Sequence, residues 1–154
     1  MNGNLDQIDR KVLTFLQNDG RMSVVDLAER IGLSPTATTE RVKRLTREGY
    51  ILGYGARLNA DLLGRGLLVF IEVKLDRTTS DVFERFAEAV VDAPEVLECH
   101  MVAGGFDYLI KTRVADMTAY RRFLGEVLLS LPGVRETHTF AVMEEVKNTS
   151  ALPV

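Results

Sequence analysis

The stretch from Ser23 to Pro35, SVVDLAERIGLSP, predicts two short helices joined by a tight glycine turn. Ser23 is a favourable N-cap, and Asp26 three residues later offers an aspartate version of the capping box. Gly32 ends the first helix, and Ser34, followed by a proline, begins the second. Two helices in this order predict a helix-turn-helix, whose second helix lies in the major groove of DNA.

Another helix is expected before this pair. It begins at Asp6, carries apolar residues at helical spacing over 8–16 and ends near Gly20. Asp9 lies in its first turn, where a negative charge interacts favourably with the helix dipole. After the pair, residues 50–58 are rich in aromatic and branched side chains and predict an extended strand or a hinge. The helix-turn-helix is expected to be of the winged type.

The helix expected over 34–49 has two different sides. Thr38, Val42 and Leu45 follow an i, i+4, i+7 stripe toward the core, so the opposite side is polar and mostly basic. Short side chains near its start suit base edges, and the long cations further along suit phosphates, with Arg41 on the flank able to do either. The predicted DNA-binding residues are Ser34, Thr36, Thr39, Glu40, Arg41, Lys43, Arg44 and Arg47. The alternative is a surface helix whose charges are simply solvated.

Charge is unevenly distributed along the chain. Residues 1–65 have a net charge of +2 and residues 66–154 a net charge of −5, which together give −3. An acidic isoelectric point near 5.5 does not exclude a nucleic-acid partner. Phosphate contacts depend on the cations at the docking face, and distant charges are screened beyond a Debye length of about 10 Å.

Length and composition set the class of protein. A chain of 154 residues, 46% hydrophobic and 27% charged, fits one globular domain or two small ones and is too short for a barrel enzyme. The longest apolar run is 67–71, and the N-terminus has no signal region, so no membrane partner is expected. One cysteine, Cys99, excludes an internal disulfide and favours the cytoplasm.

The second half predicts the order strand, helix, strand, strand, helix, strand. The strands are expected over 66–76, 95–103, 106–114 and 134–147, with helices starting at residues 79–80 and 116 and ending near 93 and 131. Gly104-Gly105 suits a tight hairpin turn with positive φ. This order is that of a ferredoxin-like βαββαβ sheet with both helices on one face, so the fold class is α+β. The expected domains are 1–49, a linker over 50–65, and 66–154.

The other face of that sheet is left uncovered. Leu68 and Phe70 are expected to form an apolar patch there, which a second chain related by two-fold symmetry would cover. Such a dimer presents two recognition helices to a partly palindromic operator with half-sites about 34 Å apart.

Signals for catalysis are weak. Cys99 and His100 are neighbours in a strand, so their side chains point to opposite faces. His138 is expected on the sheet edge opposite His100, which prevents the two from sharing a metal within one chain. No Walker loop, HExxH or CxxC motif is present, so no enzyme activity, cofactor or metal is expected.

Several segments are similar to one family of regulators. The chain resembles the leucine-responsive regulatory protein/AsnC family from Leu5 to about Lys147. The resemblance is carried by residues 5–10, 26–36, 53–54, 104–108, 131–134 and 142–147. It implies a bacterial or archaeal transcription regulator with an N-terminal helix-turn-helix and a C-terminal effector and oligomerisation domain. It also implies dimers, often assembled into octamers, and a small amino acid such as leucine or proline as effector.

In that family the effector binds between dimers, against the glycine turn and the neighbouring strand ends. The residues at those positions here are His100, Gly104, Gly105, Asp107, Met117, Phe140, Ala141 and Val142. Glycines admit a ligand to backbone N–H groups, Asp107 suits an ammonium group, and Met117 suits an apolar side chain. A plain hairpin turn, an aspartate cap and a core methionine are the alternative interpretation.

Gly105 stands where the Gly-Asp-Phe-Asp turn of the family has its first aspartate, which removes one carboxylate from the expected site. An alternative function is an amino-acid-binding ferredoxin-like module, or an enzyme subunit, whose N-terminal domain docks a partner protein. In that case, replacing Arg44 would leave DNA affinity unchanged.

Overall fold

The structure is a computed structural model that describes residues 5–154. The chain forms two compact units. The first unit comprises residues 5–57 together with Lys147–Val154, and the second unit comprises Leu58–Val146. None of the helices within residues 5–154 is long and apolar enough to cross a membrane.

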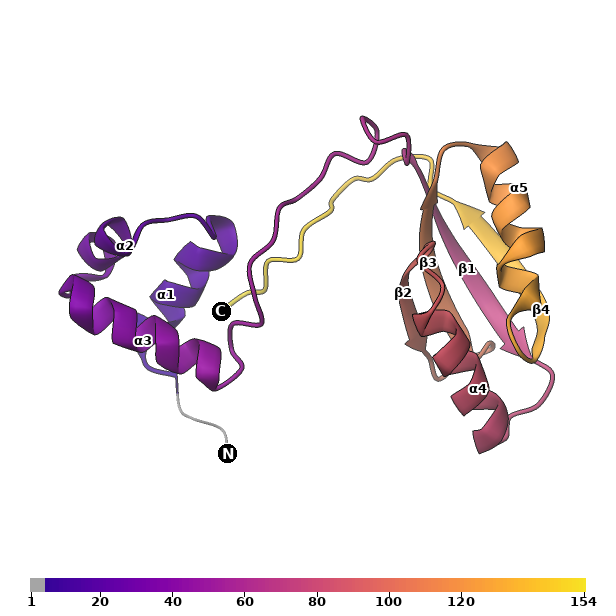
Figure 1. Cartoon of the computed structure of the whole chain (residues 1–154), viewed down its shortest axis with the longest axis horizontal. Coiled ribbons are helices and arrows are strands. Elements are labelled where there is room, and N and C mark those ends of the chain that lie inside the picture. Colours follow the sequence, from indigo (N-terminus) through magenta and orange to yellow (C-terminus); the bar gives the residue numbers. More distant parts are fainter. Residues whose placement is uncertain (1–4) are drawn as a thin grey trace. The chain divides into compact units, whose positions relative to one another are not determined.

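Three helices build the first unit, α1 (Gln7–Asn18), α2 (Val24–Ile31) and α3 (Pro35–Arg47), as Figure 1 shows. They bury a small apolar core made of Val12, Leu16, Leu27, Ile31 and Leu45. Positive φ angles at the glycines that follow α2 and α3, 71° and 80°, end these two helices. This confirms the predicted helix-turn-helix.

Capping explains where these helices begin, with one correction. The reciprocal capping box forms at α1, where Asp6 and Asp9 each accept the other's backbone N–H. The box predicted at Ser23 and Asp26 is wrong in its second half. The Asp26 carboxylate accepts the Ser23 hydroxyl at 2.6 Å instead of the backbone N–H of that residue. Ser34 caps α3 as predicted, accepting the N–H of Ala37 at 3.2 Å.

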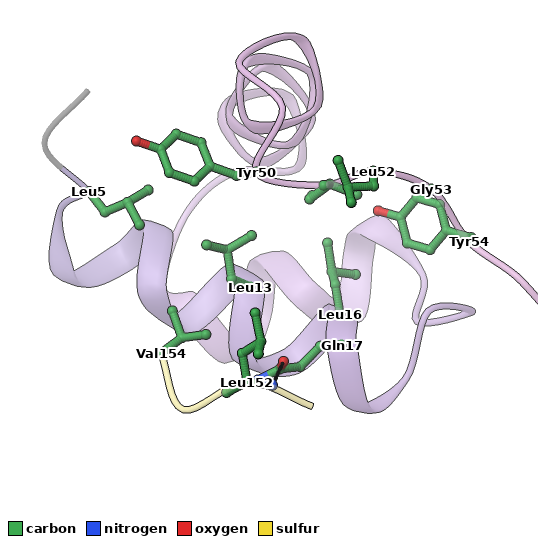
Figure 2. Close-up of a pocket in the computed structure, with 11 residues that line it drawn as sticks. Leu5, Leu13, Leu16, Gln17, Tyr50, Leu52, Gly53, Tyr54, Leu152 and Val154 are labelled. Atoms are coloured by element: carbon green, nitrogen blue, oxygen red, sulfur yellow. Dashed lines mark hydrogen bonds between the residues drawn. The ribbon is translucent and has the colours of Figure 1, made fainter. Parts of the chain in front are cut away.

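The C-terminal tail belongs to the first unit. The Gln17 side chain donates to the Leu152 carbonyl at 2.8 Å and accepts the Leu152 N–H at 2.9 Å. Figure 2 shows Leu152 and Val154 lining an apolar pocket with residues of α1 and of segment 50–54. The volume of this pocket is about 320 Å³. Within residues 5–154, segment 51–58 pairs with no strand, so the extended-strand alternative for it is wrong.

The second unit has the predicted βαββαβ order (Figure 1). Its elements are β1 (Leu67–Leu75), α4 (Ser80–Val91), β2 (Val96–Met101), β3 (Tyr108–Val114), α5 (Met117–Glu126), a short 3-10 turn (Leu128–Ser130) and β4 (Val134–Ala141). The strands form one antiparallel sheet in the order β2-β3-β1-β4. This confirms the ferredoxin-like fold.

The core of the second unit lies between the sheet and both helices. Val69, Ile71 and Val73 alternate along β1 and are fully buried, as the period of two requires. On α4, Phe86 packs against Tyr108 of β3 with 4.4 Å between ring centroids. Tyr120 of α5 joins the same core, so the two helices cover one face.

Three predicted boundaries are wrong. The last strand ends at Ala141 instead of Lys147, because its last register partner on β1 is Val69 and only Leu67 and Leu68 of β1 lie beyond that residue. The hairpin between β2 and β3 is a six-residue connection over 102–107, which needs no tight turn. The positive φ predicted at Gly104-Gly105 is therefore absent. Helix α5 ends at Glu126, and the 3-10 turn takes the place of its expected last turn.

The predicted apolar patch is smaller than expected. Leu68 is only 5% exposed and Phe70 is half-buried, so Leu68 does not belong to an open patch. The neighbour of Leu68 across the ladder is Arg113, whose ion pair with Glu145 at 2.5 Å holds the chain after β4 beside it. Phe140, opposite Phe70 on β4, remains exposed.

Candidate DNA interface and effector site

Helix α3 presents one buried side and one polar side. Thr38 and Leu45 are fully buried and Val42 is half-buried, which confirms the predicted inward stripe. The exposed members of the predicted DNA-binding set are Ser34, Thr36, Glu40, Lys43 and Arg47. The polar side therefore offers hydroxyls near the helix start and cations further along, as a groove-binding helix requires.

The exposed charges on this side are weakly engaged. Lys43 donates to Glu40 at 3.0 Å, and both side chains are about two-thirds exposed, at 65% and 68%. A pair so exposed is worth at most about 0.5 kcal/mol, so it does not compete strongly with a phosphate. The half-buried Thr39 donates its hydroxyl to the Pro35 carbonyl at 2.9 Å.

Arg41 and Arg44 differ from the other cations of α3. Arg41 donates to both Asp6 and Asp9 at 2.6 Å, and Arg44 donates to Asp9 at 2.5 Å. Arg44 was expected on the outward side, but it is only 33% exposed because it reaches toward the carboxylate of Asp9, which is 1% exposed. Two aspartates at helix-start spacing are the only sequence signal near this contact, and they do not indicate an arginine partner.

The acidic partners stay ionised. Burial raises the pKa of Asp9, but hydrogen bonds from Arg44 and Arg41 outweigh burial and hold that pKa below its usual value. The backbone N–H of Asp9, and then Arg41, lower the pKa of Asp6. The cluster thus contains two full negative and two full positive charges.

The predicted effector residues fall into two groups at opposite ends of the sheet. At one end, Asp107 accepts the Leu75 N–H at 2.8 Å, so the hairpin with Gly104 and Gly105 lies beside the end of β1. At the other end, Val142 donates to the Leu68 carbonyl at 2.9 Å. Seven residues of β1 separate these points, roughly 23 Å at 3.3 Å per residue. One chain therefore does not bring the two groups together.

Each group has its own members. His100 pairs with Leu109 near the hairpin end, and Phe140 and Ala141 end β4 at the other. Met117 begins α5 directly after β3, so it joins the β4 end.

The exposure of these residues bears on whether they form an effector site or only a hairpin turn, an aspartate cap and a core methionine. Met117 is 55% exposed, so the alternative that it is a core residue is wrong. A Cβ added at Gly104 or Gly105 would meet no atom within 4 Å, so the hairpin backbone is open to an approaching molecule. The Asp107 carboxylate does brace the hairpin through Leu75, as the alternative expected, and it remains half-exposed.

The described part of the second unit supports no catalytic dyad or metal site. His138 lies on edge strand β4 and His100 on edge strand β2, as predicted. Cys99 packs against the core, and burial raises the pKa of its thiol to about 11, so it is a poor nucleophile at neutral pH. Among residues 5–154, no group of three or more His, Cys, Asp or Glu side chains is placed to hold a metal ion.

Fold and site together define a class: a helix-turn-helix DNA-binding protein with a second, ferredoxin-like unit. Two family models match the chain, a winged helix-turn-helix DNA-binding domain over residues 5–51 and the Lrp/AsnC ligand binding domain over residues 68–152. The leucine-responsive regulatory proteins of Klebsiella pneumoniae and Escherichia coli K12 are both 57% identical to it over 150 residues. That alignment covers 97% of this chain and 92% of theirs.

A solved structure agrees with this similarity. A transcriptional regulator from Neisseria meningitidis, in complex with L-Met, is 39% identical with a TM-score of 0.92 and 97% coverage of both chains. The chain belongs to the Lrp/AsnC family. It is a transcription regulator with a DNA-binding and a ligand-binding domain, and its relatives are regulators rather than enzymes. This confirms the expected family, fold and function and leaves the alternative of an enzyme subunit without support.

Proposed function

We propose that this chain controls genes of amino-acid metabolism by binding a partly palindromic operator as a homodimer or a higher oligomer such as an octamer. The observation that carries the proposal is the polar, exposed side of α3, opposite its buried stripe. Such a protein works where the chromosome is, so the proposed location is the cytoplasm. The half-exposed Phe70 and the exposed Phe140, side by side on the uncovered sheet face, support a second copy packing there.

Roles on α3 follow from side-chain reach. Ser34, Thr36, Thr39 and Glu40 are the proposed base-edge and groove contacts, because they lie in the first half of the helix and are short. Lys43, Arg44 and Arg47 are the proposed phosphate contacts, and Arg41 supports them from the flank.

The proposed effector is a small amino acid, with leucine, proline and methionine as first choices. Methionine is included because the similar regulator from Neisseria meningitidis is in complex with L-Met. The separation of about 23 Å between the hairpin end and the β4 end of one sheet supports a site shared between copies. In such a site one copy supplies His100, Gly104, Gly105 and Asp107, and another supplies Met117, Phe140, Ala141 and Val142.

Two measurements test this function. Gel shifts with the promoter beside the protein's own gene and with a random duplex of equal length measure affinity and specificity at two salt concentrations. A thermal-shift screen of the twenty amino acids, repeated as gel shifts with each positive amino acid, identifies the effector. Equal affinity for both duplexes, or no amino acid that changes melting or binding, would contradict the proposal.

A further inference from the structure

Two arginines of α3 form ion pairs with carboxylates that also cap the N-terminus of α1. Asp6 and Asp9 form the capping box of α1, and each also accepts Arg41 at 2.6 Å. The Asp9 oxygen that binds Arg41 also accepts Arg44 at 2.5 Å. One carboxylate, 1% exposed, therefore fixes two guanidinium groups one helical turn apart.

The two arginines differ in which guanidinium nitrogens form ion pairs and in how far each side chain is exposed. The Nη1 atom of Arg41 serves both carboxylates, and the Arg41 side chain is 23% exposed. Arg44 donates to Asp9 through Nη2 and lies 3.5 Å from Glu48 through Nη1. Three residues along a helix amount to a rotation of about 60° backward, which places Arg44 further from the buried stripe and closer to the exposed side. Arg44 thus stands at the edge of the DNA-facing surface.

We propose that Asp9 is a positioning residue of the DNA interface, which holds the Arg44 guanidinium at the edge of α3 so that its outward N–H groups meet the duplex backbone. The inference rests on the proposed function of α3. A guanidinium has five N–H donors in a rigid fork, so one edge binds a carboxylate while another stays available for a phosphate. Arg41 and Asp6 balance the remaining charges of the cluster, which keeps Asp9 ionised and Arg44 in place.

A double-mutant cycle on DNA affinity tests the proposal. Asp9→Asn removes the charge with little change of shape, and Arg44→Ala removes the positioned group. Each single variant is expected to weaken operator binding about tenfold, the size of one well-oriented charged contact. Because Asp9 acts through Arg44, Asp9→Asn is expected to cost less than twofold more in the Arg44→Ala background. If Asp9 had a purely structural role, Asp9→Asn would weaken operator binding by the same factor in the wild-type and Arg44→Ala backgrounds. The reason is that Arg41 is attached to Asp9 in both backgrounds.

The chain provides a matched control. Asp26 occupies the same position of α2, three residues after the cap, and within residues 5–154 its carboxylate binds the Ser23 hydroxyl and no arginine. Asp26→Asn is expected to keep operator affinity within twofold. Circular dichroism and the melting temperature verify that each variant is folded at the temperature of the binding assay.

The outcomes are distinguishable. Tighter binding by Asp9→Asn would mean that Asp9 withholds Arg44 from DNA, and additive losses would mean a structural role; either result overturns the proposal. Should Asp9→Asn not fold, Arg44→Lys decides, because lysine keeps the charge and lacks the fork. Unchanged affinity of Arg44→Lys overturns the proposal, and a tenfold loss supports it. If wild-type protein does not prefer the operator, the proposed function fails before this question arises.

Discussion

Lys43 offers a sharp test of the DNA interface because its removal has little effect on the fold. Its ammonium group contacts Glu40 at 3.0 Å in a pair that is about two-thirds exposed, so Lys43→Ala changes the free energy of unfolding by at most about 0.5 kcal/mol. A lysine that neutralises one phosphate contributes about 0.9 to the slope of log affinity against log salt concentration. The variant is therefore expected to bind all duplexes more weakly at low salt and to have a slope smaller by about 0.9.

That slope sets a measurable factor. When salt rises from 50 to 200 mM, a slope smaller by 0.9 means that Lys43→Ala loses about 3.5-fold less affinity than the wild-type protein. Fluorescence anisotropy with a labelled operator and a random duplex at four salt concentrations resolves this factor. The loss should be equal on both duplexes, since phosphate contacts have no sequence preference.

A surface pair in the second unit provides the control. Arg85 and Asp81 on α4 are 3.1 Å apart and as exposed as the Lys43 pair, at 63% and 70%. Arg85→Ala should leave both affinity and salt slope unchanged. If Lys43→Ala and Arg85→Ala gave the same slope, the assignment of the polar side of α3 to the duplex would be refuted.

Three further predictions concern stability and the effector. The lowered pKa of Asp9 means that its contribution to stability is present above its ordinary pKa of 3.8 and is lost as pH falls below that value through the folded-state pKa. Acid unfolding followed by circular dichroism should therefore show wild type and Asp9→Asn converging at low pH, and a constant difference would contradict this cause. Phe86→Ala in the core should cost about 3–5 kcal/mol in urea unfolding, whereas exposed Val91→Ala on the same helix should cost under about 0.5 kcal/mol. Asp107→Asn keeps an acceptor for the Leu75 N–H, so it should melt like wild type and bind operator but show no thermal shift with the cognate amino acid. A normal shift in that variant would remove Asp107 from the effector site.

Local signals made the first unit predictable from sequence. Asp6, Ser23 and Ser34 each accept a backbone N–H at a helix start, and Gly32 ends α2 in a left-handed conformation. Such contacts involve neighbours within four residues, so a single sequence contains them. The strand order of the second unit followed from the sequence of elements because few connections are compatible with it.

Long-range side-chain contacts were not predictable in the same way. The pairing of Asp9 with Arg44 joins residues 35 positions apart, and nothing in the spacing of either helix indicates it. The eight predicted effector residues were expected at a site between dimers, and the register of β1 with its two neighbours places them at opposite ends of the sheet, a division that the sequence does not indicate. Register depends on which residues the whole sheet buries, which a local pattern does not specify.

The return of the chain end to the first unit has a practical consequence. Because Leu152 is held by Gln17 of α1, the sheet and its helices form an insertion between two parts of the DNA-binding unit instead of an appendage after it. A purification tag fused behind Val154 would begin beside α1 and segment 50–54 of the first unit. Isolating the N-terminal fragment by cutting at residue 57 would leave Leu13 and Leu16 without their C-terminal cover.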